Sequence, residues 1–469
     1  MSQFQRVGAA CAALMVPCAA SAGDLPDAVP SVIVVGQRAS LDTASQIRRA
    51  GPGVVDAVVA DQIDKLPDFS VTDALQRIPG VQIARDRGDG TAVAIRGLTQ
   101  METTLNGREV FTAGAGRNLD FADVPADMVA AIAIHKTAIA SQLEGGVGGL
   151  ADLRTRRPFD FSGTRLAATA RYVHGELAGG GAPQYSALAS TRWQTAVGEF
   201  GALASVSVQR RAWREDQKSS AEPRLRKDLL AGQDVLVQAG GTETASVGRR
   251  ERNAFSTMLQ WRPSAGIELY AEGSYAQFKT VQDSYQVNLS APATFVPGSV
   301  TLFPGTRDVQ TVTWTNAPVS VLSFARDTVD RNRQLAAGGS WRTGNWLLQL
   351  DASHTESYNN LFFSGATLAA TAPAYRIDYS GKVPVTAVEG LAQQGAAAYR
   401  YVGVPYRTRP FDGALDALRL DATLARPGSL FHTVTAGVRL ARRSAGNAPG
   451  LIVADAPVSL PASAAPLGA

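Results

Sequence analysis

The fold of this 469-residue chain is decided by the stretch ADQIDKLPDFSVTDALQRIPGVQIARDRGDGTAVAIRGLTQMETTLNGREVF, from Ala60 to Phe111. The glycine-rich run EGGVGGLADLRTRRP comes later, from Glu144 to Pro158, and a long series of alternating segments follows it directly. A chain of this length is expected to hold two structural units. The order of the patterns predicts a compact α+β module ahead of a large β-structure.

Local signals divide the module into helices and strands. Ser70 and Asp73 form a helix-capping pattern, and Pro79-Gly80 stops the helix that they begin. Asn106-Gly107 lies between two short β-prone runs and predicts a tight hairpin. The other predicted elements are a helix from Val71 to about Ile78, strands at Val81–Ala84 and Ala92–Arg96, and a second helix from near Pro125 that turns Met128, Val129 and Ile132 inward.

Residues 1–22 have the pattern of a removable export signal. Arg6 supplies positive charge, Val7 to Val16 is a short apolar run, and Ala20-Ser21-Ala22 fits the small-residue cleavage pattern. Cys11 and Cys18 both lie inside this segment, so we expect a mature chain without thiols, disulfides or a cysteine metal site. A lipoprotein signal built on Cys18 is the competing interpretation.

Composition and motifs argue against several classes of function. The formal net charge is +4 and basic residues are interspersed with acidic ones, so we expect no nucleic-acid partner. The sequence has no nucleophile elbow and no phosphate-binding loop, so we expect no enzyme and no catalytic residue. The histidines have no metal-ligand spacing, so we expect no metal site and no cofactor. They are His135, His174, His354 and His432.

The chain beyond Arg165 alternates with period two over about nine segments of roughly 7 to 12 residues each. From Glu199 to Gln209 the even positions are apolar, and polar residues such as Ser205 and Ser207 lie opposite. No apolar run long enough for a transmembrane helix follows the signal, so only a closed β-barrel can place this chain in a membrane. Short links alternate with long ones, which favours an outer-membrane barrel over a soluble sandwich. The predicted long loops are Arg210–Ala254, Phe278–Arg333 and Glu356–Ala417, and the predicted interfacial aromatic residues include Tyr172, Trp193, Trp213, Trp261, Trp341 and Trp346.

Several separated motifs stand in a fixed order along the first third of the chain. They are Asp68–Val81, Ala94-Ile95-Arg96-Gly97-Leu98, Leu105-Asn106-Gly107-Arg108 and Glu144–Pro158. Together they resemble the plug domain of TonB-dependent outer-membrane receptors, and most of all the type abundant in Caulobacter and Xanthomonas. The resemblance implies an α+β plug domain followed by an antiparallel transmembrane β-barrel in the bacterial outer membrane, with membrane lipid around it. It also implies ligand-gated active import of a scarce small nutrient: a siderophore, cobalamin or an oligosaccharide.

A β-branched run near the N-terminus is similar to the TonB box that precedes such plugs. The resemblance implies that this run pairs, as an added strand, with periplasmic TonB. The alternative is that the run forms the first strand of the plug itself. The residues concerned are Val32, Ile33, Val34, Val35 and Gly36.

The resemblance also implies that outward-facing loops of the plug touch the ligand. The residues that it selects are Arg87, Gln100, Glu102, Thr112, Arg117 and Asn118. Plug arginines are expected to pair with carboxylates of the barrel strands, such as Glu268 and Glu272, and simple solvation of each arginine is the alternative. The arginines considered are Arg96, Arg108, Arg154, Arg156 and Arg157.

The expected organisation is a signal peptide (1–22), a TonB-box segment and linker (23–50), a plug domain (51–158), a partial β-barrel (159–442) and an Ala/Pro-rich tail (443–469). Barrels that house a plug of this size resemble the 22-stranded class, whereas about nine strands are recognisable here. The sequence therefore predicts a C-terminally truncated product. A nonfunctional receptor fragment and a passive outer-membrane porin are the alternative functions.

Overall fold

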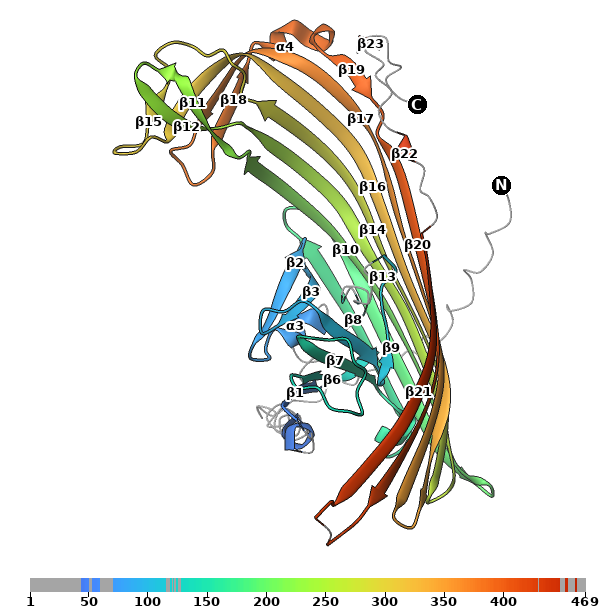
Figure 1. The fold of residues 1–469 in the computed structure, drawn as a ribbon. Coiled ribbons are helices and arrows are strands. Elements are labelled where there is room, and N and C mark those ends of the chain that lie inside the picture. Colours follow the sequence, from blue (N-terminus) through green and yellow to red (C-terminus); the bar gives the residue numbers. More distant parts are fainter. Residues whose placement is uncertain are drawn as a thin grey trace, which may run out of the picture.

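A computed structural model describes residues 44–49, 53–59, 71–114, 119, 121, 124, 128–428, 430–447, 452–453 and 460–461. Figure 1 shows a small mixed module held against the concave side of a tall, curved sheet. We call the module, residues 53–155, the plug, and the tall sheet the wall sheet. No helix in the described part of the chain has the length and hydropathy that a transmembrane helix needs.

The plug is built on a five-stranded sheet and a separate two-stranded hairpin. The sheet has the order β1-β6-β7-β4-β5, in which only β4 and β7 run parallel, and β2 pairs with β3. Its core contains fully buried side chains from the helix, the hairpin and the sheet, including Leu75, Ile95, Ile132 and Leu153. The elements are β1 Val55–Val59, α3 Val71–Leu75, β2 Val81–Asp86, β3 Asp89–Ile95, β4 Met101–Leu105, β5 Arg108–Glu109, β6 Val129–His135 and β7 Gly149–Thr155.

The predicted first helix and both hairpins are present. The α-helix ends at Leu75, before the predicted Ile78, because the amides of Arg77 and Ile78 bond three residues back instead of four, as in Ile78 N to Leu75 O. Asn106 and Gly107 have φ values of 54° and 80°, as a two-residue hairpin turn requires. Ser70 lies outside the described residues, and the Asp73 carboxylate accepts a 2.8 Å bond from Arg85.

The predicted second helix is wrong. The described part of that segment is strand β6, which lies between β1 and β7 and is hydrogen-bonded on both edges. Val129 and Ile132 are buried as expected, but Ala133 and Ile134 are buried too. A short apolar run does not distinguish a helix from a central strand, and pairing with two neighbours decides in favour of the strand.

The glycine run before β7 is a tightly packed part of the plug. Gly148 N donates to the carbonyl of Gln100, and Gly149 N donates to that of Gly146. A Cβ built on Gly146 would lie 2.6 Å from the Glu102 nitrogen and 2.1 Å from the Gly149 oxygen. The run is therefore glycine-rich because its backbone lies directly against β4.

We expect Gly146→Ala to destabilise the plug by about 1–3 kcal/mol, because the added methyl group overpacks against backbone that cannot move aside. Urea unfolding of the full chain measures the change. Gly163→Ala is the matched control, since a Cβ built there has no neighbour within 4 Å. Equal losses in the two variants would contradict the packing argument.

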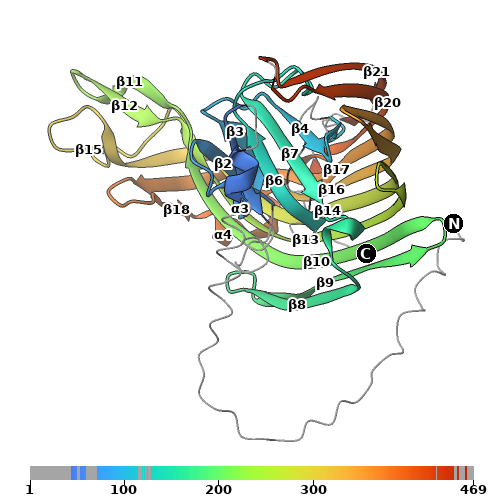
Figure 2. The ribbon, with the colours of Figure 1, turned by 90° about the horizontal axis from the view of Figure 1, so that it is seen from below.

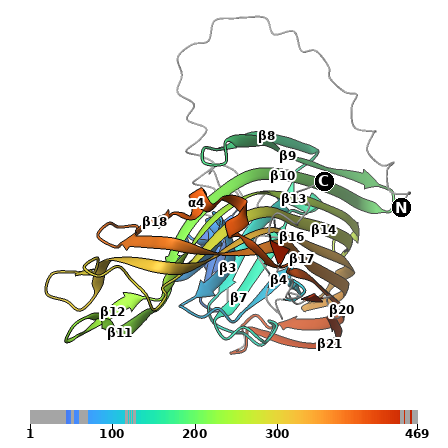
Figure 3. The same cartoon turned by 90° about the horizontal axis from the view of Figure 1, so that it is seen from above.

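Among the described residues the wall sheet has fourteen strands, and nine of them form its antiparallel main path, as the number of alternating segments predicts. Figures 2 and 3 look along the strands and show an open curve with the plug inside it. Along the path from one edge to the other the order is β21-β20-β17-β16-β14-β13-β10-β9-β8. The strands are β8 Arg165–Gly175, β9 Gly180–Thr195, β10 Gly198–Ser220, β13 Gly240–Ser264, β14 Ile267–Ser290, β16 Val309–Thr343, β17 Trp346–Asp378, β20 Tyr406–Ala425 and β21 Thr433–Asn447.

The predicted long loops are mostly strand, so that prediction is wrong. β16 and β17 contain 35 and 33 residues and remain paired over nearly their whole lengths. The alternation of apolar and polar residues fades where a hairpin extends beyond an apolar environment, although its backbone pairing continues. The sequence pattern therefore revealed only the part of each strand near the short turns. Several smaller elements accompany these strands. η3 Pro158–Asp160 precedes β8 in the chain. The long hairpins and the last segments contain β11 Pro223–Leu230, β12 Gln233–Gln238, β15 Thr301–Leu302, β18 Val385–Glu389, α4 Leu391–Gln394, η4 Gly395–Ala398, β19 Arg400–Gly403, β22 Ile452–Val453 and β23 Leu460–Pro461.

The two faces of the wall sheet differ as the alternation predicts. On β10, Ser205, Ser207 and Gln209 are buried on the plug side, whereas Val206 is 45% exposed on the convex side. Trp193, Phe200 and Trp261 stack at centroid distances of 5.9 and 5.6 Å near the short turns. Trp213 was expected among the interfacial aromatic residues, but it is buried on the inner face. β21 continues to Asn447, beyond the predicted boundary at 442.

Candidate functional site

The β4–β5 turn of the plug carries an arginine into a pair of acidic side chains on the wall sheet. Arg108, 6% exposed, donates from Nε to both Asp351 oxygens at 3.0 and 2.9 Å and from Nη2 at 2.6 Å, and its Nη1 contacts Glu272. Burial works to lower the pKa of Arg108, but the bonds to Asp351 and the charge of Glu272 raise it above its usual range. The guanidinium is therefore permanently charged and bridges β14 and β17.

The neighbouring residue makes the opposite kind of contact. Glu109 is buried and accepts from Arg443 at 2.7 Å and from Arg439 at 3.4 Å, and both arginines lie on β21. The side chains of two adjacent residues on β5 thus bind three different wall strands, with opposite charges. This arrangement fixes the turn at one position along the sheet.

A second ionic contact lies at the tip of the β2–β3 hairpin. Asp89, 3% exposed, accepts from Arg211 at 2.8 Å, pairs with Arg250, and lies 3.4 Å from Arg252. Burial works to raise the pKa of Asp89, but the charges of Arg252, Arg211 and Arg250 hold it below the usual 3.8. The carboxylate is therefore ionised at neutral pH and held by β10 and β13.

Neutral hydrogen bonds complete the contact between the plug and the wall sheet. Ala113 N donates to Ser357 Oγ at 2.8 Å, and Phe159 N, in the η3 segment just after the plug, donates to Gln260 Oε1 at 2.9 Å. A polar cleft of about 250 Å3 lies beside the Asn106-Gly107 turn and is bordered by Glu268. The interface is thus polar and charged, in contrast to the apolar interior of the plug.

The prediction that plug arginines pair with wall carboxylates is confirmed for Arg108, which pairs with Glu272 and with Asp351. Arg157 lies over the Tyr270 ring at 5.7 Å, Arg154 pairs with Asp152 inside the plug, and Arg96 donates to the Lys136 carbonyl. Glu268 pairs with Arg262 of the wall sheet itself. Plug carboxylates also pair with wall arginines, and the sequence analysis missed these pairs. The alternation of β13 could have indicated them, because Arg250 and Arg252 occupy inward positions of that strand.

The six residues predicted to touch ligand occupy different environments. Arg87 is at the tip of the β2–β3 hairpin with φ of 49°, and its guanidinium lies 4.6 Å from the Trp213 ring centroid. Gln100 is exposed, whereas Glu102 and Thr112 are buried within the plug. Arg117, Asn118 and the segment from Val32 to Gly36 lie outside the described residues.

Metal ligands are sparse in the described ranges. No group of three or more His, Cys, Asp or Glu side chains there has the arrangement to hold a metal ion. His354 pairs with Asp416 at 2.7 Å and Glu356 at 3.2 Å on the convex face.

Residues 47–150 match the model of one protein family, the TonB-dependent receptor plug domain. No curated protein matches the chain. Among solved structures, the copper transporter OprC is 10% identical with a TM-score of 0.35, and the alignment covers 84% of this chain and 60% of OprC. The chain thus spans less than two thirds of that transporter.

Two further solved structures are similar. The ferric citrate transporter FecA in its unliganded form is 11% identical, with 86% of this chain and 80% of that chain covered and a TM-score of 0.31. A mutant of the ferric enterobactin receptor PfeA from Pseudomonas aeruginosa is 12% identical, with 86% and 72% covered and a TM-score of 0.36. Residues 47–150 therefore belong to the plug family of TonB-dependent receptors, and the strands of the antiparallel wall sheet follow this plug in the chain.

Proposed function

We propose that this receptor imports a scarce nutrient, a siderophore, cobalamin or an oligosaccharide, actively across the bacterial outer membrane. Binding of the ligand at the side of the long hairpins signals to the plug, and periplasmic TonB then pulls on the segment from Val32 to Gly36. The observation that carries the proposal is the set of buried ion pairs by which Arg108, Glu109 and Asp89 bind the plug to the wall sheet. Separating a buried ion pair leaves unpaired charges and therefore costs free energy, so work is needed to move the plug away from the wall sheet.

The residues predicted to touch the ligand that the structure describes differ in how accessible they are in the plug. Arg87 and Gln100 lie on plug turns and remain our first candidates for ligand contact, and Arg117 and Asn118 belong to the same predicted set. Glu102 and Thr112 are buried in the conformation described, so they reach a ligand only after the plug rearranges. TonB pairing over four or five residues supplies roughly 2–7 kcal/mol, at about 0.5–1.5 kcal/mol for each main-chain hydrogen bond.

Deleting residues 32–36 is expected to reduce uptake to the level of a host without the receptor, because TonB then has no strand to pair with. The measurement is accumulation of labelled ferric siderophores, cobalamin and oligosaccharides in cells that lack other receptors of this family. Deleting residues 25–29 shortens the chain equally and is expected to leave uptake intact. Uptake that survives the first deletion would favour a passive porin.

A further inference from the structure

A second arginine, Arg157, borders the polar cleft in which Arg108 binds the wall sheet. The cleft has a volume of about 250 Å3, and Tyr270 and Asp351 line it together with both arginines. The Arg157 guanidinium lies 5.7 Å from the centroid of the Tyr270 ring, and the Tyr270 hydroxyl donates to Asp351. Arg157 forms no ion pair with any residue that the structure describes. An unpaired cation thus lies one aromatic ring away from the carboxylate that Arg108 occupies.

The segment that carries Arg157 is fixed to the wall sheet, although it directly follows the plug in the chain. Two residues further on, Phe159 N donates to Gln260 Oε1 of β13 at 2.9 Å. The Phe159 ring centroid lies 5.2 Å from the Arg192 guanidinium on β9 and 4.4 Å from the Arg262 guanidinium on β13. These contacts keep Arg157 at the wall sheet when the plug moves, whereas Arg108 moves with β5.

We propose that Arg157 takes over Asp351 when movement of the plug withdraws Arg108. Separation of the Arg108–Asp351 pair otherwise leaves a carboxylate without a cation in a poorly solvated contact, which is unfavourable. Arginine suits this exchange, because it stays charged and its flat guanidinium group packs on an aromatic ring while it waits. The exchange therefore stabilises the displaced plug without stabilising the plug in its place against the wall sheet.

The inference rests on the proposed function, because import requires the plug to leave its place against the wall sheet. It gives the two arginines opposite effects on that movement. Arg108 stabilises the plug in place, so its loss makes displacement easier. Arg157 stabilises the displaced state, so its loss makes displacement harder. An arginine that merely attached the plug to the wall sheet would act in the same direction as Arg108.

The test is native-state hydrogen exchange of residues 101–110 in the full chain in detergent micelles. We expect Arg157→Met to slow exchange of this segment at least fivefold, because displacement then leaves Asp351 without a cation. Arg157→Gln also removes the charge and serves if Arg157→Met fails to fold. Arg157→Lys keeps the charge and is expected to exchange within twofold of the unchanged chain. Arg165→Met is the matched control, since it removes an exposed arginine from the start of β8 and is also expected to stay within twofold.

The same substitution in the Arg108→Met background supplies the second measurement. Displacement of the plug no longer separates an arginine from Asp351 there, so adding Arg157→Met is expected to change exchange less than twofold. Faster or unchanged exchange in Arg157→Met alone overturns the proposal, and so does slowing that persists when Arg108 is already absent. These measurements need neither TonB nor a ligand, so they fail or succeed independently of the uptake experiment.

Discussion

Replacing Arg108 by methionine is expected to weaken the contact between the plug and the wall sheet by about 3–5 kcal/mol. The substitution keeps most of the side-chain volume but leaves Glu272, which is 9% exposed, and Asp351 without their cation. Two carboxylates left close together in a poorly solvated contact also repel each other. Native-state hydrogen exchange of residues 101–110 in the full chain measures the loss, because this segment carries β4, the turn and β5.

Arg154→Met is the control for that experiment. Arg154 is also a plug arginine paired with an aspartate, but its side chain is 49% exposed, so the loss is expected to be about 1 kcal/mol or less. Adding Glu272→Gln and Asp351→Asn to the Arg108 variant is expected to recover much of the stability, because no buried charge then lacks a partner. Similar losses at Arg108 and Arg154 would argue against an ionic contact between the plug and the wall sheet.

Sequence patterns predicted the plug where a local signal was sufficient. Asn106-Gly107 specifies its turn because both residues accept positive φ, and Pro79-Gly80 ends the helical region. The segment from Val129 to His135 failed because its apolar residues fit a helix face as well as a central strand. Its neighbours β1 and β7 lie far away in sequence, and no local pattern encodes their pairing.

The ionic contacts were predicted less well than the strands that carry them. The alternation of apolar and polar residues predicted which face of β10 is polar. It does not predict the position along a wall strand at which a plug residue makes contact. Arg108 meets Glu272, whereas Glu268, four residues earlier on the same strand, pairs with Arg262. That choice depends on the register between two separately folded units, which only the tertiary structure fixes.

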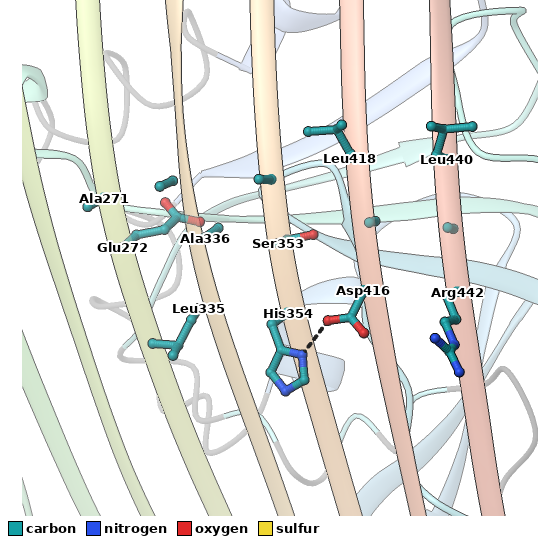
Figure 4. Close-up of a pocket in the computed structure, with 14 residues that line it drawn as sticks. Ala271, Glu272, Leu335, Ala336, Ser353, His354, Asp416, Leu418, Leu440 and Arg442 are labelled. Atoms are coloured by element: carbon teal, nitrogen blue, oxygen red, sulfur yellow. Dashed lines mark hydrogen bonds and ion pairs between the residues drawn. The ribbon is translucent and has the colours of Figure 1, made fainter.

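On strands β17, β20 and β21 the convex face changes from apolar to charged side chains, whereas on β16 the exposed Leu335 lies opposite His354. Figure 4 shows Leu418 and Leu440 at one level and His354, Asp416 and Arg442 at the next. Cross-strand pairing continues this boundary, since His354 lies opposite Asp416 and Asp416 lies opposite Arg442. A boundary of this kind is typical of strands whose apolar part faces lipid and whose extension faces water.

Leu420→Arg is expected to destabilise the receptor in a bilayer by about 2–4 kcal/mol, the loss seen for arginine near the membrane midplane. Leu420 is 47% exposed on the convex face and lies between Leu350 and Val438, which are exposed aliphatic residues on the adjacent strands. No anionic partner is within its cross-strand pairs, so the guanidinium must be buried in lipid or drag water inward. Urea unfolding from lipid vesicles measures the change.

Ala414→Arg tests whether the effect depends on depth. Ala414 is on the same strand and the same face as Leu420, but it lies beyond the apolar boundary and opposite Glu356. An arginine there remains in the polar zone beside a carboxylate, so the expected change is about 0–1 kcal/mol. A water-soluble sheet would tolerate arginine at both positions about equally, because Leu420 is exposed and Ala414 is partly exposed on the same face. Equal stability of the two variants in vesicles would therefore mean that the convex face does not meet lipid.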